Sequence, residues 1–290
     1  MLTFLFSQLA LQKPFYNQGF YVLYCAVSVA DLSYVVITYI TYRIPLLGIL
    51  VDNYRGWDLG AKLFYEGTSY TVWFQACAHT VIAFNRFTAF CLKRTHTQIW
   101  SGKPLVIILA CLCVSPLIGM SVQMSTPVSY IFTADGQIAA TFRDKNINQA
   151  VKIVGACYYL PLSIVSFTLN VMAVQRYRRY VKGISDFKTK GHNQEFRFLV
   201  HSIFMLCVQV MRVFYYAILF ISPVFVKDTA EFTGFMQANL FFISDSYSLL
   251  GSVFLFGLSS IVRRDYIRFY NFRRKKANTT IHVTNVQTVS

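Results

Sequence analysis

The sequence predicts an all-α membrane protein, and three observations support this prediction. Of the 290 residues, 55% are hydrophobic, 17% are aromatic and only 13% are charged. Soluble domains carry about 25% charged residues, so this chain has too few charges to cover a water-soluble globule of its size. Its apolar residues gather in long windows, and its basic residues fall between them. A soluble enzyme and a disordered chain are therefore both excluded.

Six windows are long and apolar enough for a helix that crosses the hydrocarbon core, which takes roughly 20 residues. They are residues 20–42, 63–84, 105–124, 152–175, 198–221 and 235–262. Residues 1–11 are also apolar, but at about 1.5 Å per residue they are too short to span. They lack the features of a cleaved signal peptide, so we expect an interfacial segment or the last half of a first helix. The predicted domains are a helical bundle over 1–262 and a tail over 263–290.

The basic residues are distributed unevenly between alternate connecting segments. Nineteen Lys and Arg residues lie in one set of segments and seven in the other, within a net charge of +15. The richer set comprises residues 1–19, 86–103, 176–197 and 263–290. The positive-inside rule places this set in the cytoplasm, which predicts a multi-pass plasma-membrane protein with a cytoplasmic C-terminus. The basic segments suit a lipid bilayer surface, and we expect no nucleic-acid partner.

Three ionisable residues lie at membrane depth, where charges are costly and usually face a bundle interior. Asp31 lies midway along the first window, whereas Arg212 and Asp245 both lie roughly 14 Å below the outer surface. Consecutive antiparallel helices would bring Arg212 and Asp245 together, so we predict that they pair. Pairing offsets much of the cost of burying either charge. The pair serves either as a structural clamp or as a clamp that is also part of a switch.

Other polar residues in the windows suggest a ligand pocket. Gln75 and His79 are four residues apart and so share one face of a helix. A satisfied hydrogen bond between helices is the ordinary explanation of such a pair, and a ligand contact is the alternative. The candidate pocket comprises Gln75, His79, Arg212, Asn239 and Asp245. We expect no metal site and no cofactor, since no second His or carboxylate follows His79 at the spacing of a metal ligand.

Cysteines and enzyme motifs give negative results. The seven cysteines lie in or beside the windows, so the outer segments offer no disulfide. No phosphate loop, nucleophile elbow or zinc-protease motif is present. We therefore do not expect an enzyme.

Three motifs carry a resemblance to seven-helix G-protein-coupled receptors. The run Ala83-Phe84-Asn85-Arg86-Phe87 at the end of the second window resembles the acidic/Arg/aromatic triplet of their third helix. The run from Ser28 to Leu32, which contains Asp31, resembles the Leu-Ala-x-x-Asp-Leu motif of their second helix. Residues 263–270 resemble their short amphipathic eighth helix, which lies on the cytoplasmic membrane surface.

The order and spacing of these motifs are similar to those of the nematode serpentine receptor class gamma (Srg) chemoreceptors. The run from Ile82 to Ala89, followed by Gln98-Ile99-Trp100, carries this closer resemblance. It implies a rhodopsin-like seven-helix bundle with six clear spans and a truncated or missing first helix. It also implies an extracellular small-molecule or peptide ligand and a cytoplasmic heterotrimeric G protein, with Asn85, Arg86 and Phe87 at the switch.

Two departures from the receptor pattern and one alternative function remain. Asn85 replaces the usual acid and cannot form an ion pair with Arg86, and the last window lacks Asn-Pro-x-x-Tyr. The alternative is a polytopic transporter or channel, in which Asp31, Arg212 and Asp245 line a polar path. Such proteins usually show internal repeats and broken helices, which the sequence does not.

Overall fold

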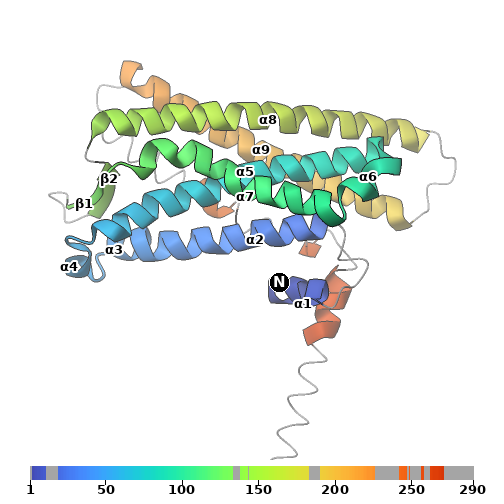
Figure 1. The fold of residues 1–290 in the computed structure, drawn as a ribbon, viewed down its shortest axis with the longest axis horizontal. Helices are drawn as coiled ribbons and strands as arrows, with labels where there is room; N and C mark the ends of the chain where they lie inside the picture. The colour runs from blue at the N-terminus through green and yellow to red at the C-terminus, as the bar shows by residue number, and fades with distance from the viewer. Residues whose placement is uncertain are drawn as a thin grey trace, which may run out of the picture.

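The computed structural model describes residues 2–10, 19–132, 138–142, 144–182, 190–225, 242–246, 248, 256–257 and 262–270. Its long helices lie side by side along one axis (Figure 1). The helices are α1 (Leu2–Ala10), α2 (Gly19–Thr38), the π-helix η1 (Tyr39–Arg43), α3 (Ile44–Leu46), α4 (Val51–Tyr54), α5 (Asp58–Cys91), α6 (Lys93–Ile99), α7 (Gly102–Met124), α8 (Lys145–Lys182) and α9 (Lys190–Phe225). Strand β1 (Val128–Phe132) pairs antiparallel with β2 (Ile138–Phe142).

The prediction of an all-α membrane protein is confirmed for the bundle. Among the described residues, three helical stretches are long and apolar enough to cross a membrane: Gly19–Arg43, Gly102–Ser121 and Ile153–Arg179. A shorter apolar stretch covers Leu199–Tyr215 in α9. The first five predicted windows lie within α2 with η1, α5, α7, α8 and α9. Most of the sixth window lies outside the described residues.

Helix α5 is less apolar than these stretches because it lies at the centre of the bundle. It contacts α2, α7, α8 and α9 along its length, and β1 near its start. Every residue from Trp73 to Thr80 is buried. Since neighbouring helices cover it, its polar side chains face protein rather than lipid, which is where polar groups of membrane helices are tolerated.

Segments α3, α4, β1 and β2 gather at one end of the bundle, which we call the hairpin end; α6 marks the opposite end (Figure 1). The sequence predicts helices only, so the hairpin of β1 and β2 was not predicted. Its first strand reads Val-Ser-Tyr-Ile-Phe, a composition of β-branched and aromatic residues that favours a strand. Val128, Tyr130 and Phe142 bury their side chains against Tyr54 and Phe64, so the hairpin covers the end of the bundle.

Two hydrogen bonds join the hairpin end to the extension of α2, at carbonyls that Pro45 leaves available. Pro45 has no backbone N–H, and Ile44 donates its own N–H to Tyr39 O in the π-helix. The carbonyls of Ile40 and Thr41 therefore receive no hydrogen bond from residue 45. Two tyrosine hydroxyls take that place: Tyr54 Oη donates to Ile40 O at 2.6 Å, and Tyr130 Oη donates to Thr41 O.

The two tyrosines join the hairpin end to η1 by hydrogen bonds, and all seven cysteines are free. Their rings meet edge to face, with centroids 5.6 Å apart. Burial raises the pKa of Tyr54 and Tyr130 above the ordinary value of a tyrosine. Both hydroxyls thus stay protonated and able to donate at neutral pH.

Helix α1 lies against the C-terminal helix formed by residues 262–270. The Phe4 ring is buried, and its centroid lies 5.5 Å from that of Tyr266 and 5.6 Å from that of Phe269. Ile267 and Tyr270 are exposed, and the Tyr270 ring packs beside that of Tyr266, with centroids 4.7 Å apart. Residues 262–270 therefore pack aromatic rings against α1 and leave Ile267 exposed.

Replacing Tyr130 with Phe tests the role of its hydroxyl. The change removes one hydrogen bond and leaves the Thr41 carbonyl without it, which costs about 1–3 kcal/mol of unfolding free energy. We expect a lower unfolding temperature for the purified protein in detergent. The control is Tyr39→Phe, because the Tyr39 side chain is half exposed. Equal shifts for the two variants would contradict a specific role for Tyr130.

Candidate functional site: a buried charge network

A chain of polar side chains joins α2, α5 and α9 in the interior. Gln75 Nε2 donates to Asp31 Oδ1 at 2.6 Å, and Arg212 Nη1 and Nη2 each donate to Gln75 Oε1 at 3.4 Å. The exposed fractions of Asp31, Gln75 and Arg212 are 7%, 0% and 1%. The amide thus offers its N–H to the carboxylate and its carbonyl to the guanidinium. This arrangement compensates both charges without direct contact between them.

The same amide also reaches the last predicted window. Gln75 Nε2 lies 3.3 Å from Ser248 Oγ, and the Ser248 side chain is buried. A single α5 residue therefore contacts Asp31 of α2, Arg212 of α9 and Ser248. We call Asp31, Gln75, Arg212 and Ser248 the amide bridge.

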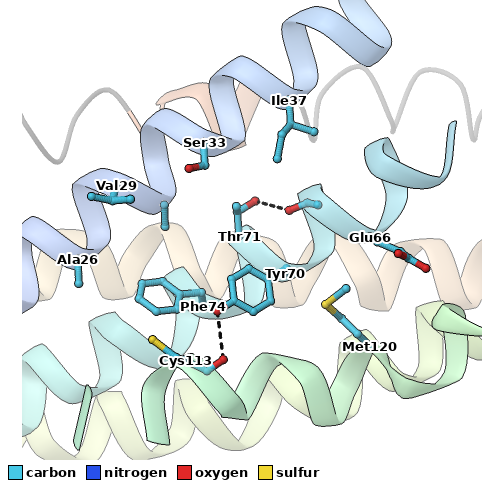
Figure 2. Close-up of a pocket in the computed structure, with 12 residues that line it drawn as sticks. Ala26, Val29, Ser33, Ile37, Glu66, Tyr70, Thr71, Phe74, Cys113 and Met120 are labelled. Atoms are coloured by element: carbon cyan, nitrogen blue, oxygen red, sulfur yellow. Dashed lines mark hydrogen bonds between the residues drawn. The ribbon is translucent and has the colours of Figure 1, made fainter. Parts of the chain in front are cut away.

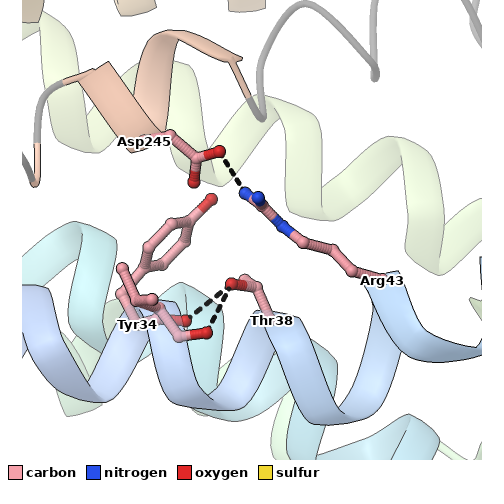
Figure 3. A network of polar contacts seen from close by, with 5 residues as sticks. Tyr34, Thr38, Arg43 and Asp245 are labelled. Carbon is pink, nitrogen blue, oxygen red and sulfur yellow. Dashed lines mark hydrogen bonds and ion pairs between the residues drawn. The ribbon is translucent and has the colours of Figure 1, made fainter.

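An ion pair lies nearer the hairpin end, at the end of η1. Arg43 Nη2 forms an ion pair with Asp245 Oδ2, and the Arg43 guanidinium lies 4.6 Å from the centroid of the Tyr39 ring. Figure 3 shows Tyr34 reaching from α2 toward the same carboxylate. The Arg43 and Asp245 side chains are 23% and 25% exposed. We call this ion pair the latch, since it ties the end of η1 to residues 242–246.

The predicted direct pair between Arg212 and Asp245 is wrong. Asp245 binds Arg43, whereas Arg212 lies against Gln75. The prediction compared depths in two neighbouring windows and left Arg43 in the connecting segment beyond the first window. The π-helix carries the helical backbone through Arg43, which keeps this side chain on the bundle and within reach of Asp245.

The structure describes four of the five residues that were predicted to line a ligand pocket. His79 follows Gln75 by one turn of α5 and is buried, and His201 of α9 is buried as well. Gln75, His79 and Arg212 therefore share one interior column. Asp245 lies in the latch, and Asn239 lies outside the described residues.

The α6 end holds the predicted switch residues. Arg86 Nη2 donates to Asn85 Oδ1 at 2.6 Å, and the Arg86 guanidinium lies 4.3 Å from the centroid of the Phe20 ring. Arg86 is only 3% exposed. Asn85 supplies a neutral acceptor, and the ring face of Phe20 supplies a favourable cation–π contact. Phe87 is partly buried, with its ring centroid 6.4 Å from that of Phe84.

Helix α6 is anchored to α5 beside these residues. Trp100 Nε1 donates to Thr88 Oγ1 at 2.8 Å. A Cβ added at Gly19 would lie 2.9 Å from Trp100 Cβ, so the glycine lets the start of α2 approach this indole closely. That approach places Phe20 over Arg86. The arrangement holds the Arg86 guanidinium inside the bundle.

Four contributing residues escaped prediction: Arg43, Tyr34, Phe20 and Ser248. One signal was present for Arg43, because it precedes Pro45 by two residues at the end of an apolar window. A proline there frees carbonyls and perturbs the helix end. Phe20 and Tyr34 gave no signal, since aromatic residues are common throughout this chain.

These features define a class of protein: a helical membrane bundle with a neutralised polar interior and a buried arginine at one end. The family model of the serpentine type 7TM GPCR chemoreceptor Srv matches residues 1–271 of the 290-residue chain. The chain belongs to this family, and it is a membrane chemosensory receptor. The broader expectation of a serpentine chemoreceptor is confirmed, whereas the match supports the Srv class and not class gamma. The comparison with curated proteins gives no match.

A double-mutant cycle on the latch tests the corrected pairing. Arg43→Ala and Asp245→Ala should each lower the unfolding free energy, and the double variant should lose less than their sum, with a coupling of about 0.5–3 kcal/mol. The matched control is the cycle of Arg212→Ala with Asp245→Ala, which should be additive within about 0.5 kcal/mol. Thermal unfolding in detergent measures the unfolding free energies in both cycles. Coupling between Arg212 and Asp245, without coupling between Arg43 and Asp245, would contradict the latch and support the direct Arg212–Asp245 pair instead.

Proposed function

We propose that this receptor lies in the plasma membrane with its C-terminus in the cytoplasm and signals to a heterotrimeric G protein. The family supports a ligand-responsive membrane receptor. The excess of Lys and Arg in alternate segments supports the orientation. The hairpin end then faces outward and the α6 end faces the cytoplasm. In this proposal the chain is a receptor without catalytic activity.

The proposed ligand site is the interior column of Gln75, His79 and Arg212, extended toward Asp245 and Asn239. A ligand that binds Arg212 competes with Gln75 for the guanidinium, and a ligand that binds Asp245 competes with Arg43 for the carboxylate. Such a ligand thereby favours any state in which the amide bridge or the latch is rearranged. The ligand's differential affinity for the two states sets the size of the response.

The proposed switch is the release of Arg86 from Asn85 and Phe20. The buried guanidinium supports this role, because the contacts described above that hold it are one amide and one ring, and both can be exchanged for other partners. The basic segments 86–103 and 176–197 would lie beside it on the cytoplasmic surface. They also attract anionic lipid, at about 1 kcal/mol per Lys or Arg near the surface.

The transporter alternative has less support. Transporter sites are typically built from broken helices near the bilayer midplane. Here α5 runs unbroken from Asp58 to Cys91 and passes the amide bridge at its middle. The family match likewise favours a receptor.

Weakening the contact that holds Arg86 should raise ligand-independent signalling. Phe20→Leu removes a cation–π contact of about 1.4 kcal/mol, which shifts a two-state equilibrium about tenfold toward the released state. The measurement is basal nucleotide exchange on G proteins added to the cytoplasmic side of membranes that carry the receptor. Arg86→Ala should abolish the signal at equal receptor abundance.

The matched control is Phe90→Leu. The Phe90 ring lies at the same end of α5 but packs on Tyr177, with centroids 5.6 Å apart. This variant should keep the basal rate of the unaltered receptor. Equal basal rates for Phe20→Leu and Phe90→Leu would overturn the proposed switch. Signalling that survives Arg86→Ala would do the same.

A further inference from the structure

A groove lies on the outer side of the bundle, between α2, α5 and α7, away from the interior column. Its volume is about 550 Å³, within the range of about 300–1,000 Å³ typical of small-molecule sites. Figure 2 shows α2 and α7 as its two walls, with Phe74 and Tyr70 of α5 between them. Val29 at its mouth is exposed, whereas Phe74 and Met120 are buried. The groove therefore opens toward the lipid and deepens toward α5.

Small residues create the space. Ala26 and Ala30 of α2 line the groove on one side, and Gly67 of α5 lies near its hairpin end. A Cβ added at Gly67 would lie 2.9 Å from Ile37 Cδ1, so α2 and α5 pack tightly there. The lining residues of α2 extend from Ala26 to Ile37, about 16 Å along the helix axis. The space is thus long enough for an alkyl chain.

Most of the polar groups in the groove are already used. Tyr70 Oη donates to Cys113 O at 3.1 Å, and Thr71 Oγ1 donates to Gly67 O at 2.9 Å (Figure 2). The remaining wall is almost entirely apolar. A ligand that fills this part of the groove gains binding free energy by burying its hydrocarbon surface, at about 25 cal/mol per Å² removed from water.

Glu66 gives the groove one polar end. It lines the groove together with Ser33, and its Oε1 atom is buried and accepts no hydrogen bond from the residues that the structure describes. The Lys62 ammonium lies 3.6 Å from that oxygen, one turn earlier on α5. This oxygen can accept a hydrogen bond from a donating or cationic head group, beside or in place of the Lys62 ammonium, whereas an anionic head group has no donor to offer it.

We propose that the groove binds a single-chain amphiphile from the bilayer, with its alkyl tail along Ala26, Ala30 and Phe74 and a hydrogen-bond-donating amine or hydroxyl head at Glu66. The length and the apolar wall of the groove suit an alkyl chain. A fatty acid, ionised at its head, has no hydrogen bond to donate to Glu66. This site rests on the membrane location of the bundle and not on the coupling to a G protein.

Photolabelling of the full chain in phosphatidylcholine vesicles tests the site. The probes are a long-chain alkyl amine that carries a diazirine on its tail, the matching alcohol and the matching carboxylic acid. Mass spectrometry then locates the labelled peptides. We expect the amine to label residues 26–37 and 66–74 strongly, the alcohol less, and the acid least. Excess unlabelled amine should abolish the labelling.

Two variants test the binding of the alkyl tail and of the head group separately. Ala30→Leu fills the groove and should suppress labelling by all three probes, while Ala110→Leu, on the exposed side of α7, should not. Glu66→Gln removes one charge-assisted hydrogen bond, so labelling by the amine should need about tenfold more probe. Labelling by the alcohol should change little.

Uniform labelling would overturn the proposal. If the three head groups label equally, or if exposed α7 residues such as Ile107 and Ile118 are labelled as strongly as the groove, only bulk lipid contacts this surface. Unchanged labelling in Ala30→Leu would likewise show that the groove holds no alkyl chain. None of these outcomes bears on G-protein coupling, because the readout is a covalent label and not a signal.

Discussion

Two ionisable side chains buried at the centre of a membrane bundle, Asp31 and Arg212, constrain the rest of this structure. An isolated charge at such depth costs several kcal/mol, and Asp31 and Arg212 come from helices that do not place them in direct contact. Gln75 offsets this cost, because its one amide group can donate to the Asp31 carboxyl and accept from the Arg212 guanidinium. That solution requires α5 to lie between α2 and α9, and α5 is indeed the helix that the others surround.

Helix α2, with its π-helical extension, contributes a residue to the amide bridge, to the latch and to the contact that covers Arg86. Asp31 meets the amide, Arg43 meets Asp245, and Phe20 covers Arg86. The carbonyl of Thr41 receives Tyr130 of the hairpin. A displacement of α2 relative to α5 would therefore alter the outer cover, the interior column and the buried arginine together. In the proposed function, this shared dependence is the physical route from a ligand near the hairpin end to the α6 end.

Composition and helical periodicity predict the broad architecture well, because burial in lipid demands long apolar windows and a single face for polar residues. They place Gln75 and His79 on one face of a central helix, and the motif around Arg86 indicates a serpentine receptor. They do not predict which charges meet. The Arg43–Asp245 pair depends on a π-helix that Pro45 makes possible, and the hairpin depends on tyrosine hydroxyls whose acceptors belong to a distant helix.

The most direct test replaces the buried charges together and separately. Asp31→Leu or Arg212→Met alone leaves the other charge uncompensated, and each should cost about 3–5 kcal/mol of unfolding free energy. The double variant leaves no buried charge to compensate, so its unfolding temperature in detergent should return close to that of the unaltered receptor. A double variant as unstable as the sum of the two single changes would show that the amide bridge does not join these charges.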